Sequence, residues 1–113
     1  MTNAAGNASD DRSRATNQLR FTVICTQGNC NPGPYAYRSP TQTGTAVNDL
    51  LNGETYTPEC YVGDSGGRTI NAQPWGGKQS NIWLRFRYNG TAYFPWAFAR
   101  LDGGDSLNLI PPC

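Results

Sequence analysis

Side chains that carry out catalysis are sparse in this chain. Its 113 residues include no His, four Cys and eight Asp or Glu. Without an imidazole, the usual general base near neutral pH is missing, and Ser–His or Cys–His nucleophile pairs cannot form. We therefore expect a protein that is not an enzyme.

Carboxylate pairs are the catalytic option that remains, because glycoside cleavage requires only two Asp or Glu side chains across a cleft. The candidates are Asp49, Glu54, Glu59, Asp64, Asp102 and Asp105. Most of them lie beside Gly or Asn in predicted turns, where Asp is a common turn residue. Asp102 and Asp105 also resemble two ligands of a Ca²⁺ loop, but the other ligands are missing. A small carboxylate hydrolase stays a minor alternative, and we expect no metal and no cofactor.

Four Cys in a small, Gly-rich chain are typical of an oxidised extracellular domain, in which disulfides supplement a thin core. The sequence allows three pairings and does not decide among them; we favour Cys25 with Cys30 and Cys60 with Cys113. Gly28-Asn29 allows a tight return in the first loop. The second bond would join the last residue to a central strand and stabilise the fold by about 4 kcal/mol. A metal site is the rival interpretation, which the lack of His and of Cys-x-x-Cys spacing disfavours.

Aromatic side chains, 12% of the chain, are the stronger indication of function. Their faces bind sugars, peptides and prolines by stacking and apolar burial. We assign Trp83, Tyr56 and Phe86 to the core. Trp75 lies in a polar, Gly-rich segment, so it is either a contact residue or an anchor of its loop.

Composition predicts a single all-β domain over residues 19–113. Thirteen Gly and eight Pro separate short apolar runs, and no window has a helical apolar period of useful length. Residues 1–18 contain no large apolar side chain, so we expect a disordered tail or linker. They also lack the apolar segment of a secretory leader, and we expect that an upstream signal was removed.

Charge and hydropathy argue against two classes of partner, nucleic acids and membranes. The net charge is +1 and Lys78 is the single Lys, so no basic stripe is present to hold nucleic-acid phosphates. No run of about 18 apolar residues is present, so we expect no membrane insertion. We expect a monomer.

The stretch from Ser80 to Leu101 organises the domain. Ile82, Leu84, Phe86 and Tyr88 share one face of a predicted strand, and Trp83, Arg85 and Arg87 share the other. The plain interpretation of the two arginines is a solvated face, and the alternative is a patch that binds carboxylates. Asn89-Gly90 predicts a tight type I′ hairpin. Pro95 should end the return strand and begin one helical turn, after which Leu101 re-enters the core.

Other strands are predicted on both sides of this stretch. They cover 19–25, 35–37, 46–51 and 54–62, with a last short strand at Leu107 and Leu109. Asn52-Gly53 predicts a second hairpin. Pro58 predicts a bulge or an edge position within its strand. Gly63 to Gln79 is long for a hairpin loop, and unstructured loops of that length are usually functional or disordered.

The order of these segments resembles the bacterial SH3-like (SH3b) domains of secreted and cell-wall proteins. The matching segments are Tyr37-Arg38-Ser39-Pro40-Thr41, Val47 to Gly53, Cys60, Asn81-Ile82-Trp83, Tyr88-Asn89-Gly90 and Ala92-Tyr93-Phe94. The chain departs from the family at Ala92 and Pro40, where Gly is common, and in the longer Gly63 to Gln79 loop. The resemblance implies a small SH3-like β-barrel.

The resemblance also implies a non-catalytic binding module, secreted or extracytoplasmic and associated with the cell wall. Its ligand would be peptidoglycan or its peptides. An SH3-like barrel carries its groove between two long loops, near Tyr35, Tyr37, Tyr93 and Trp96, for which contact and core both stay open. Arg38 or Arg85 would meet a carboxylate, and Trp75 would add a contact. The alternative is an extracellular protein-interaction domain, such as the sensor part of a membrane protein or a secreted inhibitor, with Trp75 as its anchor.

Overall fold

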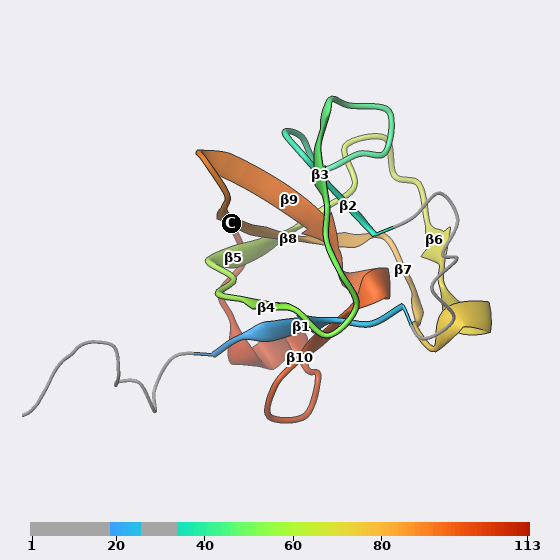
Figure 1. The fold of residues 1–113 in the computed structure, drawn as a ribbon, viewed down its shortest axis with the longest axis vertical. Coiled ribbons are helices and arrows are strands. Elements are labelled where there is room, and N and C mark those ends of the chain that lie inside the picture. The colour runs from blue at the N-terminus through green and yellow to red at the C-terminus, as the bar shows by residue number, and fades with distance from the viewer. Residues whose placement is uncertain (1–18, 26–33) are drawn as a thin grey trace, which may run out of the picture.

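Short antiparallel strands make up the fold, as the alternation of apolar residues predicts (Figure 1). The computed structural model describes residues 19–25 and 34–113, so the expected tail over 1–18 lies outside the described residues. The strands are β1 (Phe21–Val23), β2 (Tyr35–Tyr37), β3 (Ala46–Asp49), β4 (Thr55–Tyr56), β5 (Cys60–Gly63), β6 (Ile70–Asn71), β7 (Gln79–Ser80), β8 (Ile82–Arg87), β9 (Thr91–Pro95) and β10 (Ala99–Leu101). Single 3-10 turns form η2 (Gln73–Trp75), η3 (Trp96–Phe98) and η4 (Leu107–Leu109).

Three sheets contain these strands. A five-stranded sheet has the order β3-β2-β9-β8-β5, a three-stranded sheet has the order β10-β1-β4, and β6 pairs with β7. The all-β prediction is confirmed. In the part of the chain that the structure describes, however, the sheets stay separate and do not close into the barrel that we expected.

The core lies between the two larger sheets, which Figure 1 shows on opposite sides of it. Phe21 of β1 stacks on Phe94 of β9 with ring centroids 5.6 Å apart, and it meets the edge of Phe86 of β8 at 5.3 Å. All three rings are buried, and so is Leu84. Tyr56 is half-buried at the margin of this cluster, 5.4 Å from Phe86. The inward face predicted for β8 is therefore correct at Leu84 and Phe86.

The hairpin between β8 and β9 follows the local sequence signals. Asn89 and Gly90 both have positive φ, 53° and 112°, as the Asn-Gly pair predicts. The pairing of Arg87 with Thr91 leaves three residues in the loop, one more than in the two-residue turn that we expected. β9 ends at Pro95, η3 supplies the single helical turn, and Leu101 of β10 is buried, all as predicted.

The second Asn-Gly turn joins two sheets and does not form a hairpin, which corrects the prediction. β3 pairs with β2, whereas β4 pairs with β1. The turn is held by β1 and its extension: Gly53 N donates to Val23 O at 2.8 Å, and Cys25 N donates to the Asn52 side chain at 2.7 Å. These bonds direct the chain from the five-stranded sheet to the three-stranded one.

Pro58 likewise divides what we predicted as one strand over 54–62. β4 and β5 on its two sides belong to different sheets. Because proline has no N–H to donate to a ladder, the chain leaves one sheet there. Backbone pairing resumes at once, since Glu59 N donates to Arg85 O at 2.7 Å.

The long segment from Gly63 to Gln79 is folded, contrary to the expectation of an unstructured loop. It contains β6, η2 and the first residue of β7, and the β6–β7 hairpin pairs Ile70 with Ser80. Lys78 N donates to Ala97 O at 3.1 Å, which ties the segment to η3. At Gly77 a Cβ atom would lie 2.2 Å from Ala97 O, so only glycine allows this close approach.

The end of the chain lies along β5. Cys60 and Cys113 form a disulfide, which confirms that pairing, and Tyr61 forms a parallel bridge with Pro112. Leu107–Leu109 is a 3-10 turn rather than the predicted strand, because the Ser106 side chain accepts the Asn108 N–H and caps it. The predicted bond between Cys25 and Cys30 involves residues outside those described and stays a prediction.

Candidate functional site

A row of side chains crosses the face of the five-stranded sheet that points away from Phe21. The register pairs Tyr37 with Tyr93, Tyr93 with Arg85, and Arg85 with Cys60. Paired residues of neighbouring strands have their side chains on the same face. We call this face, carrying Tyr37, Tyr93, Arg85 and Cys60, the outer face. Three predicted ligand-binding residues, two tyrosines and one arginine, therefore lie in one row across β2, β9 and β8.

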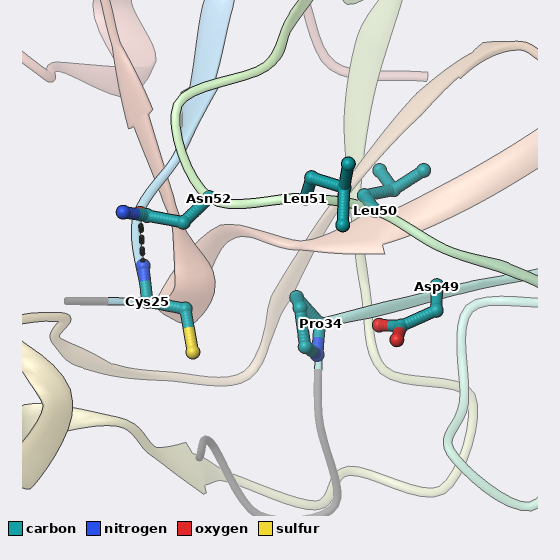
Figure 2. A pocket seen from close by; sticks show the side chains of 6 residues that line it. All are labelled: Cys25, Pro34, Asp49, Leu50, Leu51 and Asn52. Atoms are coloured by element: carbon teal, nitrogen blue, oxygen red, sulfur yellow. Dashed lines mark hydrogen bonds between the residues drawn. The ribbon is translucent and has the colours of Figure 1, made fainter. Parts of the chain in front are cut away.

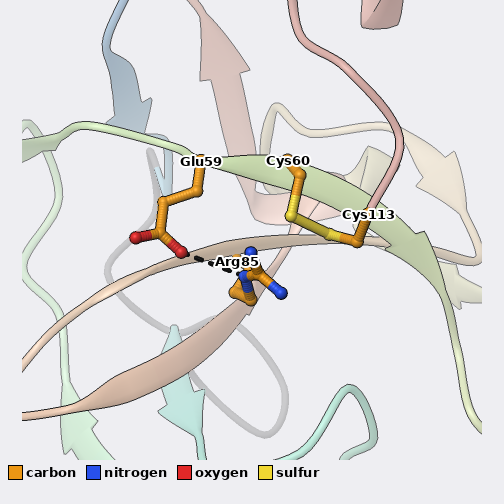
Figure 3. The surroundings of a disulfide bond; sticks show 4 residues. All are labelled: Glu59, Cys60, Arg85 and Cys113. Carbon is orange, nitrogen blue, oxygen red and sulfur yellow. Dashed lines mark hydrogen bonds and ion pairs between the residues drawn. A yellow bond between two sulfur atoms is a disulfide. The ribbon is translucent and has the colours of Figure 1, made fainter.

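Arg85 is the charged centre of this row. Its Nε donates to Glu59 Oε1 at 3.0 Å, and the two side chains are 39% and 37% exposed (Figure 3). Among the described residues, the terminal nitrogens Nη1 and Nη2 of Arg85 have no hydrogen-bond partner. The disulfide lies beside this pair and joins β5 to the end of the chain (Figure 3). Glu59 thus orients the guanidinium while leaving its outer edge available.

Part of the outer face is covered. Trp83 shares this face with Arg85, as the alternation predicts, and its side chain is fully buried, which confirms its assignment to the core. Its indole N–H donates to Asp64 Oδ1 at 3.0 Å, and the ring meets Tyr37 edge-on at 5.6 Å. Ser65 N donates to Pro40 O at 2.9 Å, so the loop between β2 and β3 meets the segment that follows β5.

Tyr37 belongs to this covered part. It is only 5% exposed, and burial raises the pKa of its hydroxyl, with a smaller contribution from Tyr35. Tyr35 is half-buried and meets Tyr37 edge-on at 6.4 Å, and Tyr93 is also half-buried. Of the three tyrosines, Tyr35 and Tyr93 therefore retain surface that a ligand could contact.

Arg38 supports the β8–β9 hairpin. Its Nη1 donates to Thr91 O at 2.8 Å and to Tyr88 O at 3.2 Å. These bonds satisfy two backbone carbonyls next to the turn. Arg38 therefore has a structural task that the sequence interpretation did not foresee, while Arg85 keeps donors for a ligand.

Trp96 lies in a different cluster, built around Lys78. The Lys78 ammonium is 4.7 Å from the Trp96 ring centroid, donates to Trp96 O and Ala99 O, and pairs with Asp105 Oδ2 at 3.0 Å. Asp105 Oδ1 accepts from the Trp96 indole at 2.8 Å and from Leu101 N at 2.9 Å. Burial lowers the pKa of Lys78, and the charge of Asp105 opposes that shift. This cluster joins the long loop to η3 and to the turn before η4.

Trp75 is half-buried in η2 and packs against the core, which fits the anchor interpretation better than the contact one. The structure therefore does not gather all seven predicted residues into one site. It places Tyr35, Tyr37, Tyr93 and Arg85 on one sheet face, Arg38 at the β8–β9 turn, and Trp75 and Trp96 at other positions.

Most candidate carboxylates have structural partners. Asp64 caps the turn that follows it by accepting from Gly66 N and Arg68 N. Glu54 Oε1 accepts from Leu51 N and from the Tyr56 hydroxyl, which helps burial to raise the pKa of Tyr56 to about 12. The remaining examples are the pairs of Glu59 with Arg85, Asp102 with Thr22, and Asp105 with Lys78.

A small pocket opens at the end of β3 (Figure 2). Its volume is about 130 Å³, and its lining residues are Cys25, Pro34, Asp49, Leu50, Leu51 and Asn52. The Leu51 side chain is 64% exposed. In the described ranges only Leu109, at 43%, is another exposed large apolar side chain. Sequence reasoning missed this pocket, because Asn52-Gly53 was assigned to a hairpin. It also missed the roles of Glu59, which pairs with Arg85, and of Lys78, which pairs with Asp105, because these partners are distant in sequence.

Comparison of the chain with known protein families, with curated proteins and with solved structures finds no match. Within residues 19–25 and 34–113, no helix is long and apolar enough to span a membrane. In the same ranges, no three His, Cys, Asp or Glu side chains are grouped so that they could hold a metal ion.

Proposed function

We propose that this chain is a non-catalytic extracellular binding module whose outer face recognises carboxylate-bearing peptides, such as those of cell-wall peptidoglycan. The observation that carries the proposal is the Arg85 guanidinium, held through Nε by Glu59 and presenting two terminal nitrogens beside Tyr93. The relation to SH3b domains is part of the same proposal.

The chemistry of this face suits a peptide carboxylate. A guanidinium with two free parallel N–H groups binds a carboxylate through two hydrogen bonds, which are stronger than neutral ones. Tyr93, next to Arg85 in the row, offers a half-buried aromatic surface on which a peptide backbone can pack at low entropic cost. Arg87, exposed two residues further along β8, adds positive charge on the same face. Peptidoglycan peptides contain several free carboxylates, so they fit this face.

The disulfide supports an extracellular location. Disulfides persist in oxidising compartments and are rare in the cytosol. The Cys60–Cys113 bond also lies directly beside Arg85 in the sheet register. An oxidised environment would therefore keep β5, and with it Glu59, in the position that orients the guanidinium.

Co-sedimentation with purified cell-wall sacculi tests this function. We expect the oxidised protein to sediment with the sacculi, and Arg85→Gln and Tyr93→Ala each to weaken the association at least tenfold. Arg100→Gln is the matched control, because Arg100 is also an exposed strand arginine but lies on β10 of the other sheet. Equal binding by Arg85→Gln and the native protein would remove the basis of the proposal.

An extracellular protein-interaction domain is the second candidate function. The exposed Leu51 beside the pocket favours it, because exposed apolar side chains next to a concave surface are common at protein contacts. Trp75, which the sequence suggested as the anchor of such a domain, packs against the core, so Trp75→Ala should affect folding more than binding. Capture of a protein partner that depends on Leu51 and not on Arg85 would favour this function over the first.

A further inference from the structure

β3 forms one edge of the five-stranded sheet, with β2 as its neighbour. Leu50 N donates to Pro34 O at 2.9 Å, which directs the backbone groups of Leu50 towards β2. Because these directions alternate along an antiparallel strand, Asp49, which pairs with Tyr35, directs its N–H and C=O groups away from the sheet. Among the described residues, β3 has β2 as its only neighbouring strand in this sheet. An extended chain could therefore pair with this edge.

The pocket lies where this edge ends. Asp49, Leu50 and Leu51 continue directly from β3 into its lining (Figure 2). Its volume of about 130 Å³ is well below the range of about 300–1,000 Å³ that is usual for small-molecule sites. A pocket of this size suits one aliphatic side chain, and Leu51 extends its apolar surface.

The surroundings of the pocket are acidic. Asp49 is exposed and lines it, and Glu54 lies next to it, accepting from Leu51 N at 2.8 Å. No Lys or Arg is among the described residues that line it. A basic residue would therefore be favoured on a chain that occupies the pocket.

We propose that β3 and this pocket together bind an extended segment of a partner protein. The segment adds as a strand beside Asp49, places an aliphatic side chain in the pocket, and carries a basic residue two positions away. Backbone pairing supplies affinity and the pocket supplies specificity. This site is separate from the outer face and does not depend on the proposed recognition of carboxylates.

A nuclear magnetic resonance titration with short probe peptides tests the proposal. The probe is acetyl-Lys-Thr-Leu-Thr-Lys-amide, in which Leu and both Lys share one face of a strand. We expect shift changes at Leu50 and Leu51 and slower hydrogen exchange at the Asp49 amide. Three altered probes should each bind at least tenfold more weakly: one with Ala for Leu, one with Glu for both Lys, and one with both Thr amides N-methylated.

Variants of the protein provide the matched controls. Asp49→Lys and Leu51→Ala should each weaken binding of the probe at least tenfold, while Leu109→Ala, which changes the other exposed leucine, should leave it unchanged. Arg85→Gln should also leave it unchanged, which separates this site from the outer face. Unaltered hydrogen-exchange rates in Asp49→Lys without peptide would show that this variant folds.

Three results would overturn the proposal. The first is the absence of shift changes at the highest soluble concentration of the probe. The second is equal binding of the N-methylated peptide, which would mean that no strand forms. The third is self-association of the native protein that Asp49→Lys abolishes, because the occupant would then be a second copy of the chain.

Discussion

Replacement of the Cys60–Cys113 disulfide gives the clearest quantitative prediction. The bond joins residues separated by 53 positions. In the chain-entropy model, closing a loop of this length disfavours the unfolded state by about 4 kcal/mol. We expect the double variant Cys60→Ala, Cys113→Ser to lose at least this much free energy of unfolding.

A local contribution adds to the entropic one. Tyr61 N donates to Pro111 O at 3.1 Å, and Cys113 N donates to Tyr61 O at 2.8 Å. Once the covalent bond is removed, these exposed terminal residues can leave β5, and each bond contributes about 1 kcal/mol net. The total loss is then about 4–6 kcal/mol, a large fraction of the 5–15 kcal/mol that is usual for a domain.

Urea unfolding of the oxidised native protein and of the double variant measures this loss. The slope of free energy against urea should be steeper in the variant, because its unfolded chain exposes more surface. The single variant Cys60→Ala keeps the thiol of Cys113 but cannot form the bond, so it should lose nearly as much as the double variant and controls for the second substitution. A loss below about 1 kcal/mol would refute the entropic reasoning.

Three further predictions concern residues that hold the fold together. Gly77→Ala should cost about 2 kcal/mol or more in urea unfolding, because its Cβ would lie 2.2 Å from Ala97 O, whereas Gly63→Ala, with open space around it, should cost far less. Lys78→Met should cost about 3 kcal/mol, because Asp105 and two carbonyls lose their partner; an unchanged midpoint would contradict this. Tyr56 should stay protonated until about pH 12, so its contribution to stability is present below pH 10 and is lost between about pH 10 and 12; the late part of the tyrosinate absorbance titration should lose one group in Tyr56→Phe, whereas Tyr37, whose pKa is also raised by burial, should remain in it.

Local chemistry explains which parts of the fold could be predicted from the sequence. The region from Ile82 to Leu101 depends on strand alternation, one Asn-Gly pair and one proline, all of which act over a few residues. The positive φ angles of Asn89 and Gly90, and the 3-10 turn after Pro95, follow from these signals. Such signals do not depend on the rest of the fold, so they are reliable where they occur.

Distant partners explain the main errors. Asn52-Gly53 forms a turn, as predicted, but the chain beyond it pairs with β1 because Val23 and Cys25 bind the turn. The sequence around Asn52 contains no sign of these partners. Trp83 was correctly placed on the face of Arg85 and in the core, but its indole partner, Asp64, lies 19 residues earlier and could not be predicted. The alternation of side chains along a strand predicts the face on which a side chain lies, but it does not predict which residues cover that face.

In the described part of the chain, charged side chains that bind other groups of the fold can be separated from exposed ones that do not. Charged groups are few, and most serve the fold: Lys78 holds Asp105 and two carbonyls, Arg38 holds the β8–β9 turn, and Asp64 holds Trp83. An exposed charge without such a task is therefore notable. Arg87 and the outer nitrogens of Arg85 leave the outer face positive, while Asp49 leaves the β3 edge negative. An acidic ligand would therefore bind at the outer face and a basic one at the β3 edge. For this reason we expect the basic probe peptide not to bind at the outer face, and carboxylate-bearing peptides not to bind at the β3 edge.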